Sequence, residues 1–243
     1  MGITGYTAMT AAEFQNATQL PNRLAFMACH FSCYGTGLSN LPQQLPENTM
    51  IIVNDRTPVR GHDPAVIAGQ LKALYEDLQP SCFLLDFQRP DNPETSAIAE
   101  KLVKAIPCPV GVSSLYAKDL DCPVFLPPPE IDVPLKSHLA PWAGREIWLE
   151  TAEDHQVATV TETGCSFSSA EPEETKDGYL FDGQVFCHYR AEYGPKAATV
   201  HLHRGKAALH TLLESAEALG VTLAVGLYQQ LGADFFEKDT LRN

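Results

Sequence analysis

The segment CFLLDFQRP, residues 82–90, is an apolar run that ends in polar residues. Side chains alternate along a strand, so Leu84, Asp86 and Gln88 would share one face and the residues between them the other. The polar groups of that face lie at its C-terminal end, an arrangement that often marks a site. We therefore predict that Asp86 acts in catalysis or orients a ligand, and that Gln88 forms a hydrogen bond to the ligand.

Other polar residues end predicted strands in the same way. Glu130 follows three prolines, which would hold it at a strand exit, and Glu150 lies near the end of the strand EIWLET. Both are candidate catalytic acids, because sugar hydrolysis needs a protonated acid and a second carboxylate or an equivalent nucleophile. Six further residues are candidates for binding the ligand, with the two aromatic ones as stacking surfaces: His30, Asp55, Arg56, Trp148, His203 and Tyr228.

The elements that would position these residues alternate between strands and helices. Asp63-Pro64 and Asn92-Pro93 each supply a cap and a first-turn proline for a helix. Two segments, Val157 to Glu162 and Tyr179 to Tyr189, predict an antiparallel excursion near 157–190 around the acidic run Glu171 to Asp177. The parallel strands are predicted at 24–31, 50–54, 82–87, 110–112, 124–126, 146–151, 199–203 and 222–227.

This order of elements predicts an α/β fold. Eight strands with fewer than eight good helices indicate an irregular (β/α)8 TIM-like barrel with some helices missing, formed as a single domain over residues 1–243. In such a barrel the strand C-termini meet at one mouth, so the carboxylates above would converge. The main alternative is an open doubly wound sheet, but no glycine-rich dinucleotide motif follows the first predicted strand.

Composition and charge narrow the classes of partner. The chain has 44% apolar and 19% charged residues, as globular proteins do, and its formal net charge of -13 would repel nucleic acid and anionic membranes. Seven scattered cysteines, an odd number, favour reduced thiols and a cytoplasmic location. The N-terminus has no signal-peptide pattern, and no apolar run reaches the length of a transmembrane helix. We expect no cofactor and no resident metal.

The segment that begins at Ser81 also resembles the fourth-strand motif of the family 18 chitinases, D-x-x-D-x-D-x-E followed by an aromatic residue and a proline. The resemblance places Ser81, Leu84, Asp86 and Gln88 at the four acidic positions and Pro90 at the proline, so only Asp86 is retained. In that family the terminal Glu protonates the glycosidic oxygen while the acetamido group of the substrate attacks, assisted by the neighbouring Asp. Gln88 has no titratable proton and cannot act as this general acid.

The resemblance implies a glycoside-hydrolase-like barrel that binds a carbohydrate or related polar ligand, a small molecule or an oligosaccharide. It leaves two outcomes open: a catalytically degenerate barrel, or one in which Glu130 or Glu150 supplies the missing acid. Asp86 could also be a structural carboxylate that caps the next loop or pairs with Arg89 or Arg56. Neither the substrate nor the oligomeric state is assigned by these residues.

Two other classes of function remain as alternatives. His201, His203, Arg204 and Lys206 run into a predicted helix start late in the chain, as in a phosphate-handling or metal-assisted barrel enzyme. A barrel whose ligand site has decayed would be a non-catalytic interaction module. Phosphate or a divalent ion would protect the first of these against thermal unfolding, whereas the carbohydrate hypothesis predicts no such protection.

Overall fold

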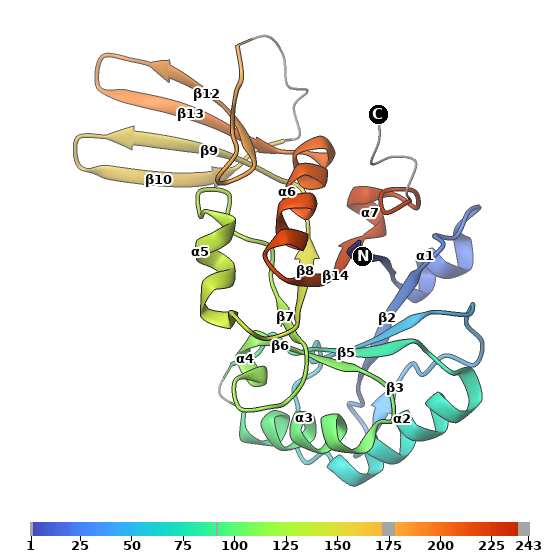
Figure 1. The fold of residues 1–243 in the computed structure, drawn as a ribbon. Coiled ribbons are helices and arrows are strands. Elements are labelled where there is room, and N and C mark those ends of the chain that lie inside the picture. The colour runs from blue at the N-terminus through green and yellow to red at the C-terminus, as the bar shows by residue number, and fades with distance from the viewer. Residues whose placement is uncertain (1, 91, 172–177, 238–243) are drawn as a thin grey trace. The chain divides into compact units, whose positions relative to one another are not determined.

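The computed structural model of the chain describes residues 2–90, 92–171 and 178–237 (Figure 1). Contacts between Cα atoms divide the chain into two compact units. The first comprises residues 1–127, 144–150 and 221–243, and the second comprises residues 128–143 and 151–220. That the whole chain is a single domain stays a prediction.

The first unit contains a closed barrel of eight parallel strands. The sheet runs in the order β1-β14-β8-β7-β6-β5-β4-β2, and a pairing of β1 with β2 closes the ring. A short strand, β3 (Leu38–Ser39), adds to β2 in the antiparallel sense. The barrel strands are β1 (Thr4–Met9), β2 (Leu24–Phe31), β4 (Met50–Asn54), β5 (Cys82–Asp86), β6 (Val110–Ser113), β7 (Val124–Leu126), β8 (Ile147–Thr151) and β14 (Val221–Leu227).

The predicted TIM-like barrel is thereby confirmed, but one of its eight strands is formed by a different segment from the one predicted. The segment 199–203, predicted as a barrel strand, lies in the antiparallel sheet of the second unit, and Thr4–Met9 takes the place among the eight. The segment 199–203 alternates polar and apolar residues, which suits a strand with one solvated face, whereas barrel strands covered on both faces are continuously apolar. With β1 counted first, β5 is the fourth barrel strand.

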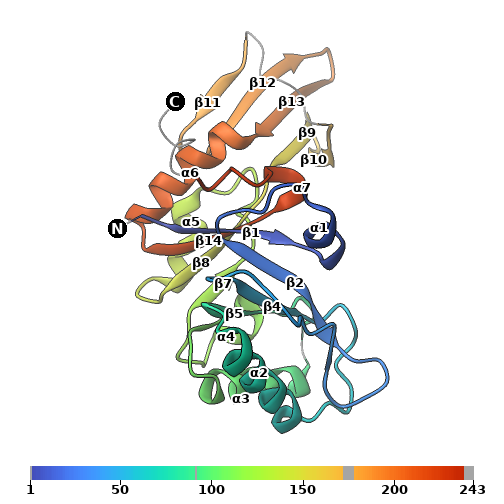
Figure 2. The same cartoon turned by 90° about the vertical axis from the view of Figure 1, so that its right-hand side faces the viewer.

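Helices follow some of the barrel strands and not others, as the sequence predicts. Asp63 caps α2 (Pro64–Leu78) by accepting from the amide of Ala65, and Asn92 caps α3 (Pro93–Ala105) in the same way. Both helices bury an apolar stripe and lie side by side (Figures 1 and 2). The other helices of this unit are short: α1 (Ala11–Asn16), α4 (Ser114–Ala117) and α7 (Tyr228–Leu231).

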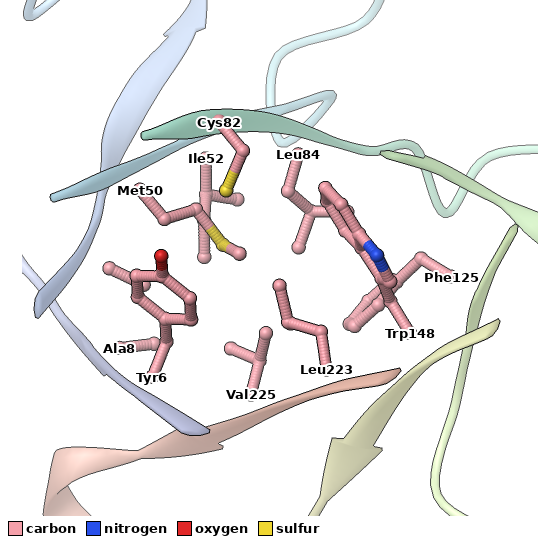
Figure 3. Close-up of a cluster of buried hydrophobic side chains, with 11 residues drawn as sticks. Tyr6, Ala8, Met50, Ile52, Cys82, Leu84, Phe125, Trp148, Leu223 and Val225 are labelled. Carbon is pink, nitrogen blue, oxygen red and sulfur yellow. The ribbon is translucent and has the colours of Figure 1, made fainter. Parts of the chain in front are cut away.

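The barrel interior is filled by side chains from alternate positions of its strands (Figure 3). Met50 and Ile52 point inward from β4, and Cys82 and Leu84 point inward from β5. The Trp148 indole lies over Gly111, where an added Cβ would come within 2.2 Å of the ring. Burial of such large apolar side chains stabilises the barrel by roughly 1.5–3 kcal/mol each. The inward alternation continues toward the strand C-termini, which fixes the residues that can face the mouth.

The second unit is built on a five-stranded antiparallel sheet of order β10-β9-β13-β12-β11. The predicted antiparallel excursion is confirmed, and it is longer than expected, from Asp154 to Arg204. Residues 172–177 of the acidic run lie outside the described residues. The elements of this unit are α5 (Leu135–Leu139), a 3-10 helix (Ala140–Trp142), β9 (Asp154–Thr161), β10 (Gly164–Ser169), β11 (Leu180–Asp182), β12 (Cys187–Tyr193), β13 (Ala197–Arg204) and α6 (Lys206–Ala218).

Within the described ranges, none of the helices has both the length and the apolar character needed to cross a bilayer.

Candidate ligand site at the barrel mouth

Two carboxyl groups lie in one pocket at the C-terminal end of the barrel strands. Asp86 continues the inward series of β5, and Glu150 continues that of β8, two residues after Trp148. Asn54 lies beside Asp86 in the register of β4 and β5. The pocket is lined by Ala8, Met27, Ile52, Asn54, Leu84, Asp86, Phe125, Glu150, Val225, Gly226 and Leu227.

The apolar lining changes how these carboxyl groups ionise. Burial, and then the negative charge of Asp86, raise the pKa of Glu150 to about 7. Burial also raises the pKa of Asp86, while the hydrogen bond from Gln88 lowers it and the charge of Asp55 raises it. The hydrogen bonds and ion pairs among the described residues include none to the Glu150 carboxyl. The mouth therefore holds an acid that is partly protonated near neutral pH and can accept or give a proton.

Gln88 lies at the rim, and its side-chain amide donates a hydrogen bond from Nε2 to Asp86 Oδ1. The Gln88 side chain is exposed, and Asp86 is half-buried. The predicted sharing of one face by Leu84 and Asp86 is seen directly, because both line the pocket. The pair can thus offer a carboxylate and a carboxamide to a ligand at one strand end.

Asp55 and Arg56 follow β4 and contact the turn after β5. Asp55 is 3% exposed, and its two carboxylate oxygens accept the main-chain amides of Gln88 (3.0 Å) and Arg89 (2.8 Å). The Arg89 guanidinium donates to the carbonyl oxygens of Asp55 and Arg56, both at 3.0 Å. The Arg56 side chain itself is exposed. Asp86 therefore pairs with Gln88, and the carboxylate that holds the neighbouring turn is Asp55.

Three other predicted residues lie in the same unit. His30, at the end of β2, is the register neighbour of Asn54, and its Nδ1 lies 3.0 Å from the carbonyl oxygen of Ala28. Tyr228 begins α7 directly after β14 and is half-buried. Trp148 is only 2% exposed and belongs to the apolar interior, with its indole N–H donated to Glu146 (3.0 Å). This placement does not support an open stacking surface at Trp148.

The remaining predicted residues belong to the second unit. Glu130 is exposed, and its carbonyl oxygen accepts from Arg204. His203 is buried on β13, where its Nδ1 lies 2.8 Å from Nδ1 of His155 on β9. Arg204 is 1% exposed and donates to the carbonyl oxygens of Pro129, Glu130 and Val185 at 2.5, 3.1 and 2.8 Å. The guanidinium predicted to meet a phosphate thus faces main-chain oxygens.

A search of residues 2–90, 92–171 and 178–237 found no group of three or more His, Cys, Asp or Glu side chains placed to hold a metal ion. Sequence reasoning missed Asn54, which lines the pocket beside Asp86. A signal was present, because the segment MIIVN turns polar at its last residue just as CFLLD does. The apolar lining from Met27 and Leu227 had no comparable signal, since most such residues are buried for packing alone.

The comparisons with known proteins agree with this geometry. No model of a protein family matches the chain, and neither does any curated protein sequence. A mutant family 18 chitinase from Cycas revoluta, solved in complex with (GlcNAc)4, is similar with a TM-score of 0.61 at 10% identity, over 96% of this chain and 97% of that chain. A chitinase from Rhizomucor miehei gives 0.58 at 10% identity, over 98% of each chain.

A chitinase-like agglutinin from Robinia pseudoacacia is similar as well, with a TM-score of 0.56 at 10% identity, over 91% of this chain and 93% of that chain. At such low identity the likeness concerns the fold. The position of β5 as the fourth barrel strand agrees with the resemblance of its sequence to the fourth-strand motif. The chain therefore has the fold of the family 18 chitinases and the chitinase-like proteins.

Proposed function

We propose that this chain is a carbohydrate-binding barrel that holds an oligosaccharide at its C-terminal mouth and does not cleave it by the chitinase mechanism. The observation that carries the proposal is the Gln88 carboxamide, hydrogen-bonded to Asp86 at the end of the fourth barrel strand. A carboxamide at this place can bind a polar ligand but has no proton to give to a leaving oxygen.

The chemistry of the mouth supports a sugar as the ligand. Met27 and Leu227 supply apolar surface for the C–H faces of a sugar ring, and Asp86 and Asn54 supply hydrogen-bonding groups. Proteins of the same fold include a mutant chitinase in complex with (GlcNAc)4 and a chitinase-like agglutinin. The complex with (GlcNAc)4 supports a sugar as the ligand of a barrel with this fold.

Calorimetric titration with chitooligosaccharides of increasing length tests the proposal. We expect saturable heat without continuing turnover, and the Gln88→Glu variant should gain slow hydrolysis because it restores an acid at that position. Gln44→Glu, an exposed glutamine in the loop before β4, is the matched control and should gain none. An absence of heat with every oligosaccharide would refute carbohydrate binding, and continuing heat in the wild type would refute the absence of turnover and direct attention to Glu150.

Phosphate or metal handling is the competing class, and it predicts a different result. Phosphate or a divalent ion would raise the thermal midpoint of the protein if a site of that kind were present. Because Arg204 is committed to carbonyl oxygens, we expect neither to do so.

We propose a cytoplasmic location on the strength of the thiols. All seven cysteines are free, and three of them are buried. Reduced cysteines suit a reducing compartment. Cell fractionation checks this, and recovery of the protein from the medium or an oxidising compartment would contradict it.

The net charge of -13 supports a further expectation, that the chain does not bind nucleic acid or anionic membranes.

A further inference from the structure

The turn after β5 is held in place by side chains from three neighbouring segments. Asp55, after β4, accepts the main-chain amides of Gln88 and Arg89 with its two carboxylate oxygens. Ser113, at the end of β6, donates its hydroxyl to the carbonyl oxygen of Phe87 at 2.7 Å, and this contact is buried. Tyr116, on α4, donates its hydroxyl to the carbonyl oxygen of Arg89.

Three successive residues, 87–89, thus have their main chain fixed by side chains of other elements. The Asp55 carboxylate bears a charge, and hydrogen bonds to charged groups are worth about 1.5–3 kcal/mol each. The Arg89 guanidinium closes the frame by donating back to the carbonyl oxygens of Asp55 and Arg56.

The frame determines what the exposed Gln88 side chain can offer. Its Nε2 donates one of its two hydrogens to Asp86 Oδ1, which orients the carboxamide and leaves the carbonyl oxygen Oε1 and the second N–H for a ligand. That oxygen accepts hydrogen bonds, whereas the protonated acid of the chitinase motif at this position would donate one. Gln88 therefore offers a ligand an acceptor oxygen that the Asp86 bond holds in a fixed orientation, but no acid proton.

We propose that Asp55 is a positioning residue, which fixes the turn so that Gln88 presents its carbonyl oxygen to the ligand and selects ligands with an O–H or N–H donor at that point. This inference rests on the proposed carbohydrate binding for its ligand, but its structural part can be tested without any ligand.

The experiment records the side-chain amide signals of Gln88 by NMR in the wild type, in Asp55→Asn and in the control Asp63→Asn. Asn at position 55 keeps one acceptor but turns an NH2 group toward the second amide. We expect two well-separated Gln88 amide protons in the wild type and in the control, and averaged signals in Asp55→Asn. Asp63 caps α2, and Asn is an equally good cap, so the control should fold normally.

A pH titration measures the ionisation of Asp86, which a loss of stability alone would not change. The groups that act on the Asp86 carboxyl are Gln88, Asp55 and Glu150. Removal of the negative charge at position 55 should shift the Asp86 transition, followed through the Gln88 amide signals, to lower pH. Unchanged signals and an unchanged transition in Asp55→Asn would overturn the positioning role.

Binding of (GlcNAc)4 tests the ligand part. Asp55→Asn and Gln88→Met, which keeps the length of the side chain but removes the acceptor, should each weaken binding by at least about tenfold. Undiminished affinity of Gln88→Met would overturn the acceptor role. If the wild type binds none of the chitooligosaccharides, the proposed function fails, while the NMR result still decides the role of Asp55. Should Asp55→Asn not fold, Ser113→Ala loosens the same turn through its other anchor and takes its place.

Discussion

The barrel mouth and the antiparallel sheet use polar residues in opposite ways. At the mouth, Glu150 lies among apolar side chains with no partner among the described residues, and its pKa is raised to about 7. In the sheet, Arg204 is more deeply buried, yet three carbonyl oxygens accept its hydrogen bonds. A buried guanidinium that donates to three main-chain oxygens holds the fold together, whereas a half-buried carboxyl without such partners costs stability when ionised and marks a place for a ligand or a reaction.

The largest effect on stability is expected where the guanidinium bound to main-chain oxygens is removed. Arg204→Met would leave three carbonyl oxygens, one of them in a buried contact, without their donor and should lower the free energy of unfolding by about 4 kcal/mol. Urea denaturation measures this. The matched control is Arg190→Met on β12, whose partly exposed ion pair with Glu192 is worth about 0–1 kcal/mol. Equal losses in the two variants would contradict the assignment of Arg204 to the framework.

At the mouth, replacing a polar residue should raise the free energy of unfolding instead of lowering it. The pKa of Glu150 is about 7 in the folded state and about 4.3 in the unfolded chain, so the folded state holds more protons between these values and stability falls as the pH rises through this range. Glu150→Gln removes that cost and should raise the free energy of unfolding at pH 8 by about 3 kcal/mol, with the gain disappearing below about pH 4. Glu76→Gln on exposed α2 surface is the control. A variant that is less stable than the wild type at pH 8 would show that Glu150 is a satisfied structural group.

A smaller effect is expected on the pKa of Glu150, and it separates the two causes that raise this pKa. Burial is the larger cause of its raised pKa, and the charge of Asp86 is the second. Asp86→Asn should therefore lower the pKa of Glu150 below about 7 without returning it to the ordinary value of a glutamate. NMR titration of the carboxyl carbons measures this, with Asp77→Asn as the control. An unchanged pKa would mean that the two carboxyl groups do not interact.

Much of the barrel could be predicted because its strands have simple patterns. Apolar runs such as MIIVN and CFLLD, separated by capped helices, can be recognised without a structure. The strand Thr4–Met9 could not, because GYTAM mixes small and polar residues and becomes a barrel strand through its pairing with β2 and β14. The opposite error at 199–203 has the same origin, since parallel and antiparallel pairing are decided by partners far away in the sequence.

The candidate site also has one part that could be predicted from the sequence and one part that could not. The shared face of Leu84 and Asp86 follows from the period of a strand, and so could be predicted. Gln88 follows the end of β5, where that period no longer applies. The binding of Asp55 to the Gln88 turn could not, because it joins residues that follow two different strands, through main-chain amides that the sequence does not reveal. Whether Glu130 and His203 take part in the site stays a prediction.

The most direct test of the central claim is methyl NMR of the whole chain during titration with (GlcNAc)4. The methyl groups of Met27, Leu84 and Leu227 line the mouth, while those of Val200 and Leu202 lie on β13 of the antiparallel sheet. We expect saturable shifts of the first set, none of the second, and no release of shorter sugars during the experiment. Shifts confined to the β13 methyl groups, or none at either place, would contradict the assignment of the ligand site to the barrel mouth.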